Sequence, residues 1–121
     1  MTDSRTIVIK MEKQEPTREE VNSLAGVTLL EFGASWCGYC QAAQATITAE
    51  MAQFPTIRHL KIEDGKGRRL GRSFHVKLWP TLIFMQDGVE IQRLVRQIDA
   101  AELRAALSSV SLPRDFSGDG I

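Results

Sequence analysis

The feature that most constrains this chain is a pair of cysteines, Cys37 and Cys40, which follow an apolar run and open a stretch with helical spacing. They are the only two cysteines among the 121 residues. The apolar run, residues 27–32, is typical of a strand buried on both faces, as in a parallel or mixed sheet covered by helices. A Cys-x-x-Cys pair between a strand and a helix indicates a thiol–disulfide redox site.

Hydrophobic spacing and turn residues along the rest of the chain predict alternating strands and helices. We expect strands over residues 6–11, 27–32, 57–62, 81–85 and 89–95, and helices over residues 17–25, 37–54, 68–74 and 99–110. Thr17 and Glu20 have the spacing of a capping box, and Asp87-Gly88 between two β-rich runs indicates a hairpin. The order β-α-β-α-β-α-β-β-α predicts an α/β fold with a central mixed sheet flanked by helices.

Length and composition predict one domain over residues 1–110 and a frayed tail over residues 111–121, where Pro, Gly, Ser and Asp dominate. Fifteen basic residues balance fifteen acidic ones, so no global field favours nucleic acid or an anionic membrane as a partner. The first ten residues lack the apolar core of a signal peptide, and no run reaches the roughly 18 apolar residues of a membrane span. We therefore expect a cytoplasmic location, or a periplasmic one if a leader has been removed.

Thiol–disulfide exchange needs a thiolate that attacks and a second thiol that releases the mixed disulfide. A helix beginning near Cys37 offers unpaired N–H groups and the positive end of its dipole to a thiolate there. We expect Cys37 to be the nucleophile, and Cys40, one turn deeper and more shielded from solvent, to be the resolving thiol. Two alternatives are a structural pair and half of a zinc site. Zinc usually needs four ligands, and neither a second cysteine pair nor suitably spaced histidines are present, so we expect no metal.

The sequence Trp36-Cys37-Gly38-x-Cys40 resembles the active-site sequence of the thioredoxin family, and the likeness covers roughly residues 6–110. The resemblance implies the thioredoxin fold. It also implies a cis-proline facing the cysteines at Pro80, although an ordinary trans proline would suit the sequence alone.

Two charged positions also match the family. Glu31 falls where thioredoxins have a buried Asp beneath the second cysteine, and Lys61 falls on its partner lysine in the neighbouring strand. The resemblance implies that Glu31 accepts and returns the proton of Cys40, and that Lys61 pairs with Glu31 and tunes it. A plain structural ion pair between the two is the alternative.

Several residues around the cysteines are expected to contact substrates, and some depart from the family pattern. The expected substrate-binding residues are Trp36, Gly38, Tyr39, Trp79, Pro80 and Arg96. Tyr39 replaces a proline, Leu78-Trp79 replaces a smaller pair, and Arg96 replaces a glycine, so we expect an altered client surface. Trp36 is either a wall of the site or a partly buried core aromatic.

The resulting hypothesis is a thiol–disulfide oxidoreductase, most simply a protein disulfide reductase that acts on client proteins. No nucleotide or flavin motif occurs, so we expect no cofactor, and electrons would arrive from an external protein reductant or leave to an oxidant. We expect a monomer with no nucleic-acid or membrane partner. The rival hypothesis is a partner-binding module or redox switch with little turnover.

Two further features are given structural interpretations. The basic cluster of Lys66, Arg68, Arg69 and Arg72 is interpreted as a solvated helix face. His59 lies on an expected inner strand and is interpreted as a hydrogen-bonded structural residue.

Overall fold

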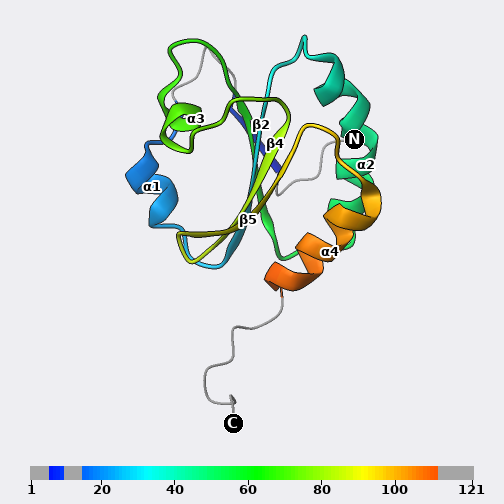
Figure 1. The fold of residues 1–121 in the computed structure, drawn as a ribbon. Helices are drawn as coiled ribbons and strands as arrows, with labels where there is room; N and C mark the ends of the chain where they lie inside the picture. The colour runs from blue at the N-terminus through cyan, green and yellow to red at the C-terminus, as the bar shows by residue number, and fades with distance from the viewer. Residues whose placement is uncertain (1–5, 10–14, 112–121) are drawn as a thin grey trace.

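The computed structural model describes residues 6–9 and 15–111, which form a five-stranded sheet with helices on both faces (Figure 1). The strands are β1 (Thr6–Ile9), β2 (Val27–Gly33), β3 (Arg58–Glu63), β4 (Thr81–Gln86) and β5 (Val89–Val95). The helices are α1 (Arg18–Asn22), α2 (Gly38–Met51), α3 (Arg69–Ser73) and α4 (Ala100–Ser111). The predicted order of elements is confirmed. Residues 10 and 11 of the first expected strand, and residues 112–121 of the expected tail, lie outside the described residues.

The strands lie in the order β1-β3-β2-β4-β5, and the sheet is mixed. Strand β3 pairs in parallel with β1 and β2, whereas β4 runs antiparallel to β2 and β5 runs antiparallel to β4. The register places Gly33 beside Glu63 and Phe32 beside Thr81. The ends of β2 and β3 and the start of β4 therefore meet at one end of the sheet. We call this the Cys37 end, because the cysteine pair follows β2 there.

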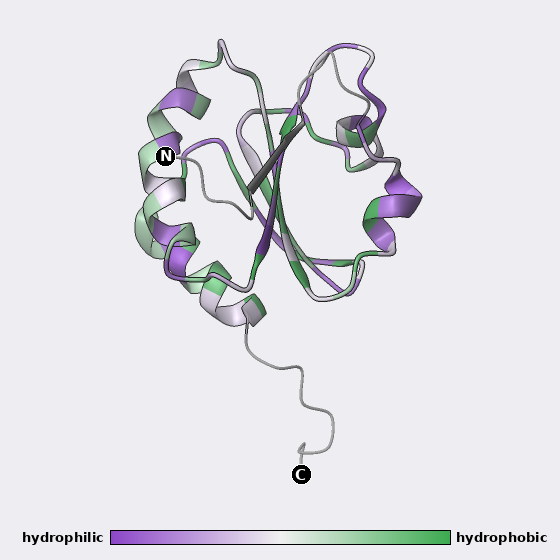
Figure 2. Cartoon of the chain, turned by 180° about the vertical axis from the view of Figure 1, so that it is seen from behind, coloured by the Kyte–Doolittle hydropathy of each residue, from purple (hydrophilic) through white to green (hydrophobic). Residues whose placement is uncertain are grey.

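Helices α2 and α4 cover one face of the sheet, and α1 and α3 cover the other (Figure 1). Each face has its own buried core, one centred on Leu29, Ile47 and Leu107, the other on Leu30 and Phe74. Residues 28–32 of the central strand are all buried, as a strand covered on both faces requires. In Figure 2 the strands and α2 carry green apolar stretches, whereas α1 is mostly purple.

Local sequence signals explain where α1 and the hairpin form. The Thr17 hydroxyl accepts the Glu20 N–H at 3.0 Å and the Glu20 carboxylate accepts the Thr17 N–H at 2.9 Å, which confirms the capping box. At the hairpin, Asp87 and Gly88 have φ of 51° and 83°, the left-handed values that a two-residue turn of this kind needs. A Cβ on Gly88 would also overlap the carbonyl oxygen of Asn22, so this glycine allows α1 to lie against the hairpin.

Candidate active site

Cys37 is the N-cap of α2 and not its first helical residue, so the helix begins one residue later than the sequence predicts. Its extended backbone, with φ −80° and ψ 121°, turns the side chain back over the first turn. There Sγ accepts the N–H of Cys40 at 3.2 Å. Both cysteines are free thiols, so the structure represents the reduced pair. A donated N–H favours negative charge on the sulfur that accepts it.

The relative burial of the two thiols differs from the prediction. Cys37 is buried, with only 7% of its surface exposed, whereas Cys40 is half-buried. The reason is the loop before β4, which lies over Cys37 and places the carbonyl oxygen of Trp79 4.0 Å from Sγ. Cys40 instead faces a pocket between α2 and the sheet.

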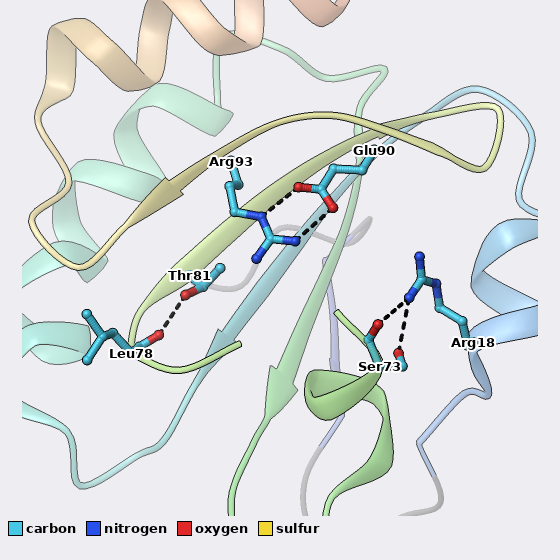
Figure 3. Close-up of polar contacts among 6 residues, drawn as sticks. All are labelled: Arg18, Ser73, Leu78, Thr81, Glu90 and Arg93. Atoms are coloured by element: carbon cyan, nitrogen blue, oxygen red, sulfur yellow. Dashed lines mark hydrogen bonds and ion pairs between the residues drawn. The ribbon is translucent and has the colours of Figure 1, made fainter. Parts of the chain in front are cut away.

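The loop over Cys37 contains the one cis peptide bond of the described residues, between Trp79 and Pro80, as the resemblance implied. Side chains and backbone hold this loop from two directions. The Thr81 hydroxyl donates to the Leu78 carbonyl oxygen at 2.6 Å (Figure 3), and the Arg96 N–H donates to the Pro80 carbonyl oxygen at 2.7 Å. The backbone that faces the nucleophile is therefore fixed by both β4 and the segment after β5.

Two tryptophans form one side of the site. The Trp79 indole N–H donates to the Asp64 carboxylate at 2.9 Å, and its ring meets Trp36 edge-on at 5.3 Å between centroids. Trp36 is 73% exposed, so it is not a core aromatic. The sequence did not reveal the role of Asp64. Its place one residue after β3, at the Cys37 end, is the signal that could have done so.

Tyr39 and Arg96 contact each other beside the cysteine pair. The Arg96 guanidinium lies over the Tyr39 ring, 4.4 Å from its centroid, a cation–π arrangement. Arg96 has φ of 70°, a left-handed conformation that favours glycine. Its Nε is buried with no hydrogen-bond partner among the described residues. Two departures from the family pattern therefore contact each other beside the cysteines.

Glu31 is buried beneath the site, but its partner is not the predicted one. Its carboxylate lies 2.8 Å from Nε2 of His59, which is also buried, while the Lys61 ammonium donates to the side-chain oxygen of Gln44. Lys61 is the register neighbour of Glu31, and His59 lies two residues earlier on the same face of β3. The expected Glu31–Lys61 pair is therefore wrong, because the carboxylate reaches back along the strand while α2 offers Lys61 an amide acceptor.

Glu31, Lys61, Gln44 and Cys40 line a pocket of about 360 Å³ between α2 and the sheet. Burial, the hydrogen bond with Cys37, and the charges of Cys37 and Glu31 together raise the pKa of Cys40 to about 12, against a smaller opposing effect of a backbone hydrogen bond.

The Cys40 sulfur also packs tightly on β2. A Cβ added at Gly33 would lie 2.7 Å from it, so this position needs a glycine while Cys40 stays in place.

The described residues offer neither a metal-binding cluster nor a membrane-spanning helix. Within residues 15–111, no group of three or more His, Cys, Asp or Glu side chains is arranged to hold a metal ion. In the described part of the chain, no helix has the length and apolar character to cross a membrane.

Comparisons with known proteins agree with this geometry. The sequence model of the family described as Thioredoxin matches residues 8–109. The chain is 30% identical over 101 residues to "Thioredoxin" of Chlamydia trachomatis, covering 84% of this chain and 97% of that protein. Its structure is similar to that of reduced thioredoxin 2 from Pseudomonas aeruginosa, with a TM-score of 0.73, 50% identity, and coverage of 88% and 94% of the two chains. A mutant thioredoxin from Halobacterium salinarum, 23% identical with a TM-score of 0.74, shares the fold.

Proposed function

From the premise that this chain belongs to the thioredoxin family and is a thiol–disulfide oxidoreductase, we propose that it is a protein disulfide reductase. In this proposal Cys37 attacks and Cys40 resolves. The observation that carries the assignment is the N-cap geometry, because the Cys37 sulfur accepts the Cys40 N–H at 3.2 Å and lies beside the Trp79 carbonyl. The raised pKa of Cys40, about 12, keeps that side chain a neutral thiol near pH 7, so it is the poorer attacking group.

The reaction proceeds by two exchanges. The Cys37 thiolate attacks one sulfur of a client disulfide, forms a mixed disulfide, and releases the other client sulfur as a thiolate that takes up a proton. Cys40 then loses its proton and attacks the Cys37 sulfur, which breaks the mixed disulfide and releases the second client thiol. The client gains two electrons and the Cys37–Cys40 pair becomes a disulfide. An external protein reductant reverses this oxidation by the same chemistry.

Glu31 is the base for the second exchange. Its buried carboxylate and Cys40 line the same pocket, and no hydroxide is needed at neutral pH if the carboxylate takes the Cys40 proton. Lys61 lines the same pocket as Glu31 and Cys40. Lys61 acts here as a pocket cation held by Gln44, and His59 holds the carboxylate.

The client segment binds across the loop over Cys37. The Trp79 backbone faces the sulfur, and an extended client chain pairs with such free backbone groups as an added strand would. In this proposal the client contacts two pairs of side chains, Trp36 with Trp79 and Tyr39 with Arg96. Gly38 and Pro80 also contact the client. This assignment predicts that the departures at Tyr39 and Arg96 select clients without changing the chemistry.

Turnover of a model protein disulfide with added reductant tests the proposal. The wild-type protein should catalyse reduction, Cys37→Ser should abolish catalysis, and Cys40→Ser should accumulate a mixed disulfide through Cys37. Equal rates for wild type and Cys37→Ser would refute the roles assigned here.

A second candidate function is a partner-binding module whose cysteines act only as a switch. The exposed apolar side chains around the loop favour it, with Leu78 43% and Tyr39 46% exposed. In that case the double variant Cys37→Ser/Cys40→Ser would bind its partner unchanged, and reductase turnover of the wild type would be negligible.

A further inference from the structure

The segment that joins β3 to β4 is strongly basic in a chain with no net charge. This segment, residues 64–80, contains five of the fifteen Lys and Arg residues and a single acidic residue, Asp64. The five are Lys66, Arg68, Arg69, Arg72 and Lys77. The sequence alone suggested a solvated helix face, but the fold gives these charges a particular place.

The topology holds this segment at the Cys37 end of the sheet. It leaves β3 after Glu63, which pairs with Gly33, and it enters β4 at Thr81, which pairs with Phe32. Both of these ends adjoin the strand that delivers Cys37. Both ends of the segment therefore lie at the Cys37 end of the sheet, while α3 between them packs on the sheet face opposite α2 (Figure 1).

Asp64 fastens the basic segment to the site itself. Its carboxylate accepts the Trp79 indole N–H at 2.9 Å, and Gly71 of α3 packs so closely on the same carboxylate that a Cβ there would overlap it. Trp79 in turn lies with its carbonyl oxygen 4.0 Å from the Cys37 sulfur. Three consecutive contacts therefore connect α3 to the nucleophile.

Most of the cations of this segment are not neutralised within the described residues. Arg68 is the exception, since its guanidinium lies 3.3 Å from the Glu15 carboxylate. Lys66, Arg69, Arg72 and Lys77 are exposed, and no ion pair within residues 15–111 involves them. Figure 2 shows the hydrophilic colouring of this part of the chain. On the other side of the loop, Arg96 adds a further cation that no described acidic side chain pairs with.

We propose that this basic surface, defined as Lys66, Arg69, Arg72 and Lys77, selects client proteins that carry acidic residues next to their disulfide. The inference rests on the proposed reductase function and names its substrate class. Clustered unpaired charge beside a binding cleft raises the association rate of an oppositely charged partner by tenfold or more at low salt. A protein client is favoured over nucleic acid because the segment that carries these cations also carries Trp79, whose carbonyl oxygen lies 4.0 Å from the Cys37 sulfur that receives a disulfide.

Three synthetic peptides of one length, each with an internal disulfide flanked by Glu, Gln or Lys, test this inference. The pre-reduced protein is mixed with each peptide in a single turnover, and free thiols are trapped by alkylation. Each rate is divided by that of dithiothreitol with the same peptide, which removes differences in intrinsic reactivity. We expect the Glu peptide to react about tenfold faster than the Lys peptide at low salt, and the preference to shrink at about 1 M NaCl, where the Debye length is about 3 Å.

Matched variants locate the effect. The triple variant Lys66→Gln/Arg69→Gln/Arg72→Gln should lose most of the preference while its rate with the Gln peptide stays the same. The control adds negative charge at the opposite end of the molecule, where Gln53 and Ser109 are exposed, as Gln53→Glu/Ser109→Glu. This control should keep the preference, because a local surface and not net charge sets it.

The outcomes distinguish a failure of the acidic-client inference from a failure of the proposed reductase function. If no peptide reacts with the pre-reduced protein, the reductase proposal fails. If all three react at equal corrected rates, the reductase proposal stands and the acidic-client inference is wrong. The inference is also overturned if a short single-stranded DNA binds tightly and depends on these cations while the peptides show no preference.

Discussion

Glu31 and His59 form a buried hydrogen-bonded pair 2.8 Å apart, in which the imidazole is a partner of the buried carboxylate. Replacing His59 by Leu leaves the carboxylate buried without this donor, which costs on the order of 1–3 kcal/mol of unfolding free energy. His59→Gln places an amide near the former Nε2 and should recover most of the loss. Urea unfolding of the reduced protein at pH 7 measures both variants. Equal stability of His59→Leu and wild type would show that the pair contributes nothing.

The raised pKa of Cys40 predicts a loss of stability in alkaline solution. Burial is the largest cause, and the folded pKa is about 12 against about 9 for an ordinary thiol. The native state therefore holds this proton more tightly than the unfolded state. Below about pH 9 both states are protonated and the contribution is intact, whereas between pH 9 and 12 the unfolded state deprotonates first and stability falls. Between pH 9 and 12 the free energy of unfolding, measured in urea, should fall more for the reduced wild-type protein than for Cys40→Ser. An equal fall of the unfolding free energy with pH in the two proteins would contradict the raised pKa of Cys40.

At the scale of elements, the hairpin turn between β4 and β5 requires glycine for two reasons, a left-handed φ and the lack of space for a Cβ. Gly88 and Gly67 both have left-handed φ, 83° and 81°, but a Cβ on Gly67 meets nothing within 4 Å whereas one on Gly88 overlaps the Asn22 carbonyl. Gly67→Ala should cost about 1–2 kcal/mol through backbone conformation alone. Gly88→Ala should cost clearly more, because α1 must also move. Thermal or urea unfolding compares the two, and equal losses would mean that α1 does not restrain the hairpin.

The elements themselves were largely predictable, because their signals are local. The capping box at Thr17, the Asp87-Gly88 turn and the apolar run before Cys37 each depend on residues a few positions apart. Where an element begins was less certain. Cys37 proved to be a cap because its sulfur accepts an N–H, and spacing alone does not distinguish a cap from a first helical residue.

The candidate site was predictable in position but not in its pairings. Strand alternation places Glu31, His59 and Lys61 on one face, yet three long polar side chains on one face can pair in several ways. Gln44 of α2 determines the pairing, because its side-chain oxygen accepts a hydrogen bond from Lys61. Glu31 then pairs with His59. Contacts of this kind depend on the packing of an element distant in sequence, as does the burial of Cys37 under the Trp79 loop.

At the scale of the whole molecule, the fold brings three chain segments to one end of the sheet. The end of β2 supplies the cysteines, the β3–β4 segment supplies the basic surface and the loop over Cys37, and the segment after β5 supplies Arg96. The opposite end has no such convergence of site residues in the described part of the chain. In our proposal the basic surface belongs to the β3–β4 segment and the cysteines to the segment after β2, and the two segments meet where the Trp79 carbonyl oxygen lies beside the Cys37 sulfur. Changes in the basic surface should therefore alter client preference without altering the redox poise of the cysteines.

The redox poise follows from how well the reduced pair is stabilised as a thiolate. A strongly oxidising pair owes its potential to a highly stabilised thiolate of the attacking cysteine, which in our proposal is Cys37 and not the buried Cys40. The proposed reductase function therefore requires a reducing pair, in a chain where Tyr39 stands at the position of the family's usual proline.

The reduction potential of the Cys37–Cys40 pair tests the central claim most directly. The protein is equilibrated with a series of glutathione or dithiothreitol buffers, and the oxidised fraction is read from the mass added by alkylation of free thiols. A protein disulfide reductase should give a potential near or below about −250 mV, in the range of thioredoxin at about −270 mV. A potential above about −180 mV, in the range of disulfide isomerases and oxidases, would contradict the assignment.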